Sequence, residues 1–349
     1  MPNRRLKTVF AVRRFEMFDN TYFKNAKKYW YNGKFYDWSD PTLHPMTHAL
    51  HYGSSVFEGI RSHVTAQGPA IFRLPEHIDR FLLSAQVAKM EIPYSPNEIS
   101  QAIKLTLEEN RLQSAYIRPL LFYSYGNLGL VPMYSPEEML IAVWEFNVFS
   151  GDKKDQGISA YIVPWRRIHH RQLDMRAKLG GLYILSAINA VAAREHGSDE
   201  ALFLNLEGNV AEGPGANIFI VKNGQLKTND RSESILEGIT RATLLEMARD
   251  SGLQTKVGPL TRKDLFEADE AFFSGTAVEI TPIVRIADGS QAGQEAKDYP
   301  IGTGRVGKIT RSLAEAYQSV CSGKMPQYNK WLTYMEDQTA RPVPAHPYR

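Results

Sequence analysis

Residues 175–236 constrain this chain more than any other stretch, because they bring a lysine, an apolar helix and an acidic turn together. Lys178 lies beside a double glycine, a helical pattern follows over 182–196, and a predicted hairpin leads to Glu212 in the string AEGPGANIFIV. Glycine lets a backbone approach a flat ring closely, and the helix can shield the lysine from water. The stretch therefore predicts a site that combines an amine with a carboxylate.

The helix predicted over 182–196 carries an apolar stripe at helical spacing. We expect this stripe to face the core and Gly197 to end the helix as its C′ residue. The residues predicted to be buried are Leu185, Ile188, Val191 and Ala192.

The composition is that of an ordinary globular enzyme and argues against several other classes. Of the 349 residues 43% are hydrophobic and 23% charged, and at about 150 residues per domain the length suggests two domains. A net charge of +3 from scattered basic residues does not support a nucleic-acid partner. No apolar run predicts a membrane span or a secretory signal. The single Cys321 leaves no disulfide framework and fits a reducing, cytoplasmic location.

The stretch SGDKKDQG at 150–157 is predicted to be a domain linker, because it is short, charged and bounded by glycine. The expected organisation is an N-terminal extension over 1–27, a small domain over 28–149, the linker, a large domain over 158–335 and a loose tail over 336–349.

Local patterns predict the main elements of both domains. Asn32-Gly33 and Asn223-Gly224 are typical of hairpin turns. The other expected elements are helices within 76–90, 99–110, 236–253 (with Thr240 as N-cap) and 309–320, and strands over 114–126, 139–149 and 270–284, the last broken by a Ser-Gly-Thr loop.

Two further motifs carry weaker signals. His44, His48 and His51 cluster, but no carboxylate or cysteine completes a ligand set at the usual spacing, so no metal is expected. The string GTGRVGKI at 302–309 resembles a nucleotide-binding loop, but Ile309 replaces the required Ser or Thr and no clear strand of a βαβ unit precedes it. A turn into the last helix is the better interpretation.

Lys178 and Glu212 together are typical of pyridoxal-phosphate chemistry. A lysine becomes a Schiff-base nucleophile when it is removed from water or given suitable neighbours. A carboxylate beside the pyridine nitrogen keeps the cofactor ring protonated and electron-withdrawing. Either residue alone would usually be a surface charge, so the hypothesis depends on their shared context.

The phosphate of such a cofactor needs backbone N–H groups at a helix N-terminus and a cation. Gly238, Ile239 and Thr240 open a predicted helix, the Ser274-Gly275-Thr276 loop offers further donors, and Arg80 offers the cation. Taken alone, Arg80 would be a solvated charge, because it lies off the apolar stripe of its helix.

From about Tyr29 to about Ala316, the chain resembles the fold-type IV pyridoxal-phosphate enzymes, and most closely the branched-chain amino acid aminotransferases. The segments that carry this resemblance are HALHYGSSVFEGIR, EHIDR, SAYIRP, AKLGGLY, EGPGANIF, LEGITR and SGTAVEITP. Each segment alone is a weak signal, whereas the series in this order is specific.

The resemblance implies a two-domain α/β (α+β) fold, with a smaller N-terminal α/β domain, a larger pyridoxal-phosphate-binding domain with a mixed β core, and an active site between them. It implies amino-group transfer from branched-chain L-amino acids (Leu, Ile, Val) to 2-oxoglutarate. D-amino acid and (R)-amine transaminases and aminodeoxychorismate lyase are the alternatives within the family. A nucleotide-binding protein and a non-catalytic assembly protein are the alternatives outside it. The expected partners are amino acids, 2-oxo acids and further copies of the chain in a homodimer or higher oligomer, with no nucleic acid and no membrane.

At matching positions the resemblance also implies roles around the cofactor. Lys178 is the catalytic Schiff-base lysine, Tyr183 bonds the cofactor's phenolic oxygen and Glu212 bonds its ring nitrogen. The positions implied to hold the phosphate or pack on the ring are Arg80, Leu236, Gly238, Ile239, Thr240, Gly275 and Thr276.

The resemblance implies a substrate pocket as well. The backbone of Thr276 and Ala277 would hold the α-carboxylate, and Tyr52 and Leu130 would reach the pocket of a neighbouring subunit. The other implied positions are Phe57, Gly59, Tyr116, Arg118 and Phe149. Phe149 stands where some relatives have tyrosine, and Ala216 stands where a second glutamate is frequent, so both leave the substrate range open.

Overall fold

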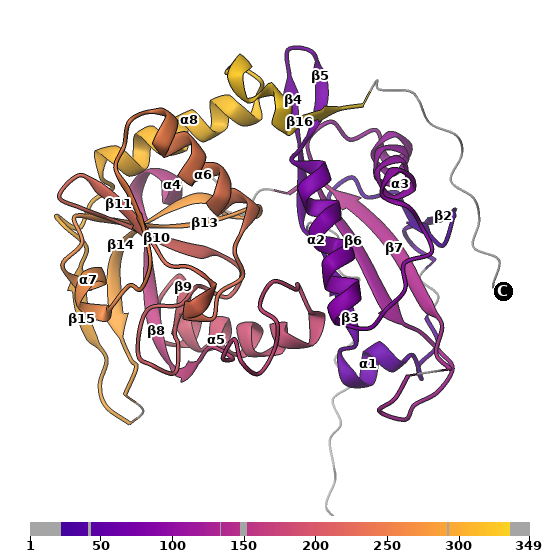
Figure 1. The fold of residues 1–349 in the computed structure, drawn as a ribbon, viewed down its shortest axis with the longest axis horizontal. Coiled ribbons are helices and arrows are strands. Elements are labelled where there is room, and N and C mark those ends of the chain that lie inside the picture. The colour runs from indigo at the N-terminus through magenta and orange to yellow at the C-terminus, as the bar shows by residue number, and fades with distance from the viewer. Residues whose placement is uncertain (1–21, 41–42, 133, 147–151, 292, 336–349) are drawn as a thin grey trace, which may run out of the picture.

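The computed structural model describes residues 22–40, 43–132, 134–146, 152–291 and 293–335. Most of the expected N-terminal extension, the expected tail and Phe149 lie outside these residues. The described chain forms two lobes side by side (Figure 1). The first lobe holds β1 to β7, β16 and α1 to α3, and the second lobe holds β8 to β15 and α4 to α8.

The first lobe is built on an antiparallel sheet in the order β16-β5-β4-β6-β7-β1-β2, with β3 paired to β6. Asn32 and Gly33 join β1 to β2 with positive φ, which confirms the first predicted hairpin. The strands are β1 (Lys28–Tyr31), β2 (Lys34–Asp37), β3 (Ser55–Phe57), β4 (Ile60–Thr65), β5 (Gly68–Phe72), β6 (Ala115–Tyr123), β7 (Glu137–Trp144) and β16 (Leu332–Tyr334).

The helices of the first lobe are α1 (His48–Tyr52), α2 (Leu74–Val87) and α3 (Pro96–Asn110). The apolar faces of α2 and α3 pack on the sheet around a core that includes Trp30, Phe81 and Ile103. Because α2 carries its apolar stripe on one side, Arg80 on its flank is free to lie at the boundary between the lobes.

The second lobe is built on a mixed sheet in the order β12-β11-β10-β13-β14-β8-β9, with β15 paired to β14. Three pairs are parallel (β8 with β9, β8 with β14, and β11 with β12) and the others are antiparallel. The strands are β8 (Ile158–Arg166), β9 (Glu200–Leu204), β10 (Asn217–Lys222), β11 (Gln225–Thr228), β12 (Thr255–Val257), β13 (Glu270–Gly275), β14 (Glu279–Asp288) and β15 (Lys297–Pro300). The expected two-domain fold with a mixed β core is confirmed.

Helices cover the mixed sheet, with α5 on β8 and β9, and α6 and α8 on β13, while α8 also contacts β14. They are α4 (Asp152–Gln156), α5 (Tyr183–Glu195), α6 (Ile239–Asp250), α7 (Arg262–Phe266) and α8 (Lys308–Cys321), with short 3₁₀ helices at Gly180–Leu182, Arg231–Glu233 and Pro326–Trp331. In the described residues no helix is long and apolar enough to span a membrane.

The end of the described chain returns to the first lobe. α8 runs from the second lobe toward the first (Figure 1), and β16 pairs antiparallel with β5. Phe72, Leu332, Tyr317 and Phe219 therefore share one apolar cluster between the lobes. A strand from the expected large domain thus joins the sheet of the small one, and the boundaries 28–149 and 158–335 stay predictions.

The prediction for the buried face of α5 was wrong. The residues that are buried are Ser186, Asn189 and Ala193, whereas Ile188 and Val191 are 54% and 57% exposed. Leu185 is partly buried beside the cluster around Phe203. The helix therefore presents part of its apolar stripe outward from the described chain.

Two other local predictions are resolved by the structure. Gly238, not Thr240, is the N-cap of α6, so Thr240 lies in the first turn with its N–H near the helix end. α8 begins at Lys308, as the turn interpretation of GTGRVGKI requires. The carboxylate of Glu270 accepts the N–H group of Thr310 at 2.7 Å, so this helix end already carries a side-chain anion.

Candidate active site

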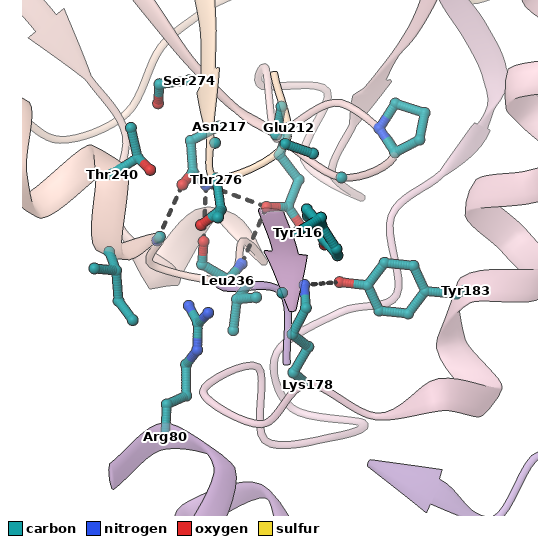
Figure 2. A pocket seen from close by; sticks show the side chains of 18 of the residues that line it. Arg80, Tyr116, Lys178, Tyr183, Glu212, Asn217, Leu236, Thr240, Ser274 and Thr276 are labelled. Carbon is teal, nitrogen blue, oxygen red and sulfur yellow. Dashed lines mark hydrogen bonds between the residues drawn. The ribbon is translucent and has the colours of Figure 1, made fainter. Parts of the chain in front are cut away.

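A cavity between the two lobes gathers most of the predicted site residues (Figure 2). α2 and β6 of the first lobe contribute Arg80 and Tyr116, and the second lobe contributes most of the others. The predicted residues that line it are Gly59, Arg80, Tyr116, Lys178, Tyr183, Glu212, Leu236, Gly238, Ile239, Thr240, Gly275, Thr276 and Ala277.

Lys178 reaches the cavity because the backbone around it lies directly against the first lobe. A Cβ on Gly180 would come within 2.1 Å of Ser55 Oγ, so a larger residue there would displace Ser55. The Lys178 N–H donates to Ser84 Oγ at 2.8 Å, and its carbonyl accepts the N–H of Phe57 at 3.2 Å. The Lys178 amine in turn donates to Tyr183 Oη at 2.6 Å, which fixes its position.

Glu212 is a buried carboxylate on the same cavity. Its Oε1 accepts from Arg167 Nε at 2.8 Å, and its Oε2 accepts from the Leu236 N–H at 3.1 Å and from Asn217 Nδ2 at 3.2 Å. Burial raises the pKa of Glu212 above its usual value, and the Arg167 guanidinium opposes this shift. A positively charged or proton-donating group in the cavity would stabilise the ionised carboxylate further.

The N-terminus of α6 forms a corner suited to an anion. Gly238 brings the helix start against β10, because a Cβ there would lie 2.3 Å from Asn217 Oδ1. Ile239 and Thr240 follow in the first turn, where N–H groups and the helix dipole favour negative charge. Ser274 Oγ is buried beside them and has no hydrogen-bond partner in the described part of the chain.

Arg80 approaches the same corner from the first lobe, so the alternative of a solvated surface charge is wrong. Its Nε and Nη2 donate to the two oxygens of Glu58 at 2.6 and 2.8 Å, and His77 donates to Glu58 at 2.7 Å. Burial alone would raise the pKa of the Glu58 carboxyl, but Arg80 and His77 hold that pKa well below its usual range. The paired carboxylate therefore fixes the guanidinium at the cavity wall.

Aromatic side chains line the opposite side of the cavity. A Cβ on Gly59 would lie 1.9 Å from Tyr116 Oη, so glycine lets the tyrosine ring close over the chain after β3. Arg118 Nη2 donates to Tyr116 Oη at 3.3 Å and its guanidinium lies 4.6 Å from the centre of the Phe57 ring. Phe57 meets Tyr183 edge to face at 4.8 Å.

Comparison with known proteins agrees with this geometry. The family described as amino-transferase class IV matches residues 55–286, which is more than half of the chain. The chain belongs to the class IV aminotransferases. It is 42% identical over 309 residues to the branched-chain-amino-acid aminotransferase of Pseudomonas aeruginosa, covering 88% of this chain and 97% of that protein. It is 38% identical over 312 residues to the Escherichia coli K12 enzyme of the same name, with the same coverage.

Solved structures give the same result for the fold of this class IV aminotransferase. The Escherichia coli branched-chain amino acid aminotransferase has a TM-score of 0.83 and 35% identity, covering 89% of this chain and 100% of that one. The enzyme of the same name from Thermobaculum terrenum, in its PLP-form, has a TM-score of 0.79 and 35% identity, covering 89% and 98%.

Some predicted positions of this class IV aminotransferase do not line the cavity. Phe57 and Arg118 lie just behind its wall, in contact with Tyr183 and Tyr116. Tyr52 and Leu130 are 46% and 79% exposed, on the outside of the described chain. Phe149 lies outside the described residues.

The sequence did not indicate a site role for five other lining residues of this aminotransferase, namely Arg167, Pro214, Gly215, Ala216 (noted only as a departure) and Asn217. Ser274, predicted as part of a donor loop, also lines the cavity. Arg167 follows the end of β8, and its position after a buried strand was the signal that could have found it. Glu58 could have been paired with Arg80 only by knowing that β3 and α2 meet.

The described residues of this aminotransferase do not form a metal site, since no three His, Cys, Asp or Glu side chains converge there. His48 bonds Ser54 and the Gly129 carbonyl, and His51 bonds the Pro45 carbonyl. The clustered histidines are therefore satisfied by local partners.

We predict that Arg167→Met destabilises the protein by about 3 kcal/mol, because it leaves the buried Glu212 carboxylate without its cationic partner. The loss should grow as pH rises. The pKa of Glu212 is already raised in the folded state. Between the unfolded and the folded pKa of this carboxyl, the folded state therefore binds more protons than the unfolded state, and the free energy of unfolding falls as pH rises through that window. Urea unfolding of the cofactor-free protein between about pH 5 and pH 8 measures this effect.

The neighbouring Arg166→Met serves as the matched control, because Arg166 donates only to the Pro164 carbonyl among the described residues. Adding Glu212→Gln to the Arg167→Met variant should restore much of the lost stability. Equal stability losses in the two arginine variants at every pH would contradict the predicted role of Arg167.

Proposed function

We propose that this protein is a pyridoxal-phosphate-dependent aminotransferase that transfers the amino group of branched-chain L-amino acids to 2-oxoglutarate. The observation that carries the proposal is the pairing of Lys178 and Glu212 on one cavity of a chain with these relatives. This chemistry requires two groups from the protein, namely an amine that holds the cofactor and a carboxylate that keeps the cofactor's ring nitrogen protonated.

The residues of the cavity fit this cofactor at both of its ends. Ser274 Oγ, buried without a partner in the described chain, the start of α6 and Arg80 offer donors and positive charge to a phosphate. Glu212 lies buried where a protonated ring nitrogen would satisfy its charge. Leu236, whose N–H already bonds Glu212, offers an apolar surface to the ring.

When bound, pyridoxal phosphate supplies an electron-withdrawing ring that stabilises negative charge at the substrate's α-carbon. Lys178 Nζ would hold the cofactor in the resting enzyme, and once the incoming substrate amine has displaced it, the free amine would move the proton at the α-carbon as general base and acid. Tyr183 Oη, 2.6 Å away, keeps that amine oriented toward the cavity. Arg80 and the first turn of α6 would hold the phosphate, which would keep the ring in place between the two half-reactions.

The substrate side of the cavity combines an aromatic wall with positive charge close behind it. Thr276 and Ala277 lie in the turn between β13 and β14 and offer backbone groups to the α-carboxylate. Tyr116 lines the cavity and offers apolar surface to a branched side chain. Phe57 and Arg118 pack behind this wall, and the Arg118 guanidinium, bonded to Tyr116 Oη, adds positive charge there for the distal carboxylate of glutamate. This arrangement supports the acceptance of both substrates in one pocket.

We also propose that the protein works as a homodimer or a higher homo-oligomer. Ile184, Ile188 and Val191 of α5 are 64%, 54% and 57% exposed, and Tyr52 and Leu130 are exposed as well. An apolar helix face of this kind is a preferred surface for association with another chain. A cytoplasmic location stays a prediction.

We predict that Ile188→Asp shifts the protein toward monomers, because a charge would be buried in the proposed interface. Ile188→Val keeps an apolar side chain and is the matched control. Sedimentation velocity on both variants and on the unchanged protein measures the assembly. A monomeric unchanged protein, or an Ile188→Asp variant that assembles like the control, would contradict the proposed interface.

We predict that Lys178→Ala abolishes amino transfer from L-leucine to 2-oxoglutarate and removes the yellow colour of the holoenzyme. Lys263→Ala, at a lysine whose side chain is 82% exposed, should leave both unchanged. Assays with D-alanine and an (R)-arylamine in parallel separate the proposed activity from the related ones. Undiminished turnover by Lys178→Ala would refute the proposed mechanism, and faster transfer from either alternative donor would refute the proposed substrate class.

A further inference from the structure

Glu279 is a buried, strained residue that the proposed chemistry does not use. It begins β14 directly after the turn that contains Thr276 and Ala277, and it is 6% exposed. Its φ of 53° lies in the left-handed region, which costs a non-glycine residue on the order of 1 kcal/mol or more. Such strain is maintained only where side-chain contacts hold the residue in place.

The Glu279 carboxylate joins elements from both lobes. Its Oε1 accepts from Arg61 Nη1 of β4 at 2.7 Å. Its Oε2 accepts from Lys154 Nζ of α4 at 2.5 Å and from Gln318 Nε2 of α8 at 2.6 Å. Burial alone would raise the pKa of Glu279, but Arg61 and Lys154 hold that pKa below its usual value, so the carboxylate stays ionised.

Arg61 also binds the backbone at the end of the first lobe, just before the segment that connects the two lobes. Its Nη2 donates to the Phe146 carbonyl at 3.3 Å, just after β7, while Lys154 lies just after the connection. The Arg61–Glu279 pair therefore holds both described ends of the segment that joins the lobes. The paired side chains are only 11% and 8% exposed, so the ion pair is screened little by solvent.

The same ion pair lies beside the substrate wall of the cavity. Arg61 pairs with Tyr116 in the register of β4 and β6, and Phe146 packs on the Tyr116 ring at 5.0 Å. From the second lobe, Ala277 packs against the cluster that contains Tyr116 and Trp144. A shift of Glu279 would therefore move the 276–278 turn relative to Tyr116.

We infer that the Arg61–Glu279 ion pair is an interlobe latch, which positions the 276–278 turn against Tyr116 and so sets the affinity for the substrate's α-carboxylate. This inference rests on the proposed function of the cavity. Arg61 and Glu279 line a separate cavity and do not line the proposed active site, so they are positioning residues that act through Ala277 and Tyr116.

The test compares Glu279→Gln, Arg61→Gln and the double variant with Asp298→Asn as the control. Glu279→Gln keeps the shape of the side chain and can still bond Gln318. Asp298 forms an exposed ion pair with Arg285 on the neighbouring strand, so its variant removes a comparable charge far from the turn. The holoenzymes are assayed with L-leucine and 2-oxoglutarate, and the binding of 4-methylvaleric acid, a branched acid without an amino group, is measured by calorimetry.

We expect each single latch variant to raise the KM for L-leucine and the Kd for 4-methylvaleric acid about tenfold, with kcat and the colour of the holoenzyme retained. The double variant should raise KM and Kd no more than either single variant does, because both substitutions remove the same ion pair. Asp298→Asn should match the unchanged protein. If Glu279→Gln fails to fold, Arg61→Gln and its Kd for 4-methylvaleric acid carry the same test.

Values of KM and Kd equal to those of Asp298→Asn would overturn the latch while leaving the proposed function intact. A loss of kcat or of bound cofactor with unchanged KM would also overturn it, because that pattern indicates a general structural role. An unchanged protein that neither transfers amino groups nor binds 4-methylvaleric acid would overturn the proposed function and the latch together.

Discussion

The site depends most on the burial of one charge, the Glu212 carboxylate. A buried carboxylate is costly unless it has hydrogen bonds and an opposite charge, and Glu212 has Arg167, Asn217 and the Leu236 N–H as its partners. These partners come from the end of β8, from β10 and from the segment before α6, so the carboxylate is accommodated only where the folded mixed sheet brings all three together. This carboxylate lines the same cavity as Lys178.

The second constraint is the close approach of the two lobes. Gly180 lies against Ser55 without room for a Cβ, and β16 crosses from the end of the described chain into the first sheet. Because the lobes share apolar core at Phe72 and ion pairs at Arg61, the cavity between them has walls of fixed spacing. Both lobes therefore contribute side chains to one cavity, as Arg80 and Tyr116 do from the first lobe and Lys178 and Glu212 do from the second.

Much of this organisation could be predicted from the sequence, because local signals were strong. The Asn-Gly hairpins, the order of helices and strands, and the cavity positions of Lys178 and Glu212 follow from turn chemistry, periodicity and motif order. The features that the sequence did not predict depend on contacts between residues far apart in the chain. The outward face of α5 around Ile188 carries an apolar stripe that a single sequence cannot distinguish from a core face. The pairing of Arg80 with Glu58, and of Arg167 with Glu212, depends on contacts between elements distant in sequence.

The most direct measurement of the central claim is the location of the cofactor on the chain. The holoenzyme is reduced with borohydride and digested, and the peptide that carries the phosphopyridoxyl group is identified by mass spectrometry. We expect the group on Lys178 and on no other lysine, because that amine alone enters the cavity that Glu212 and the start of α6 line in the described structure. A phosphopyridoxyl group on another lysine, or none at all in a folded protein saturated with pyridoxal phosphate, would contradict the claim.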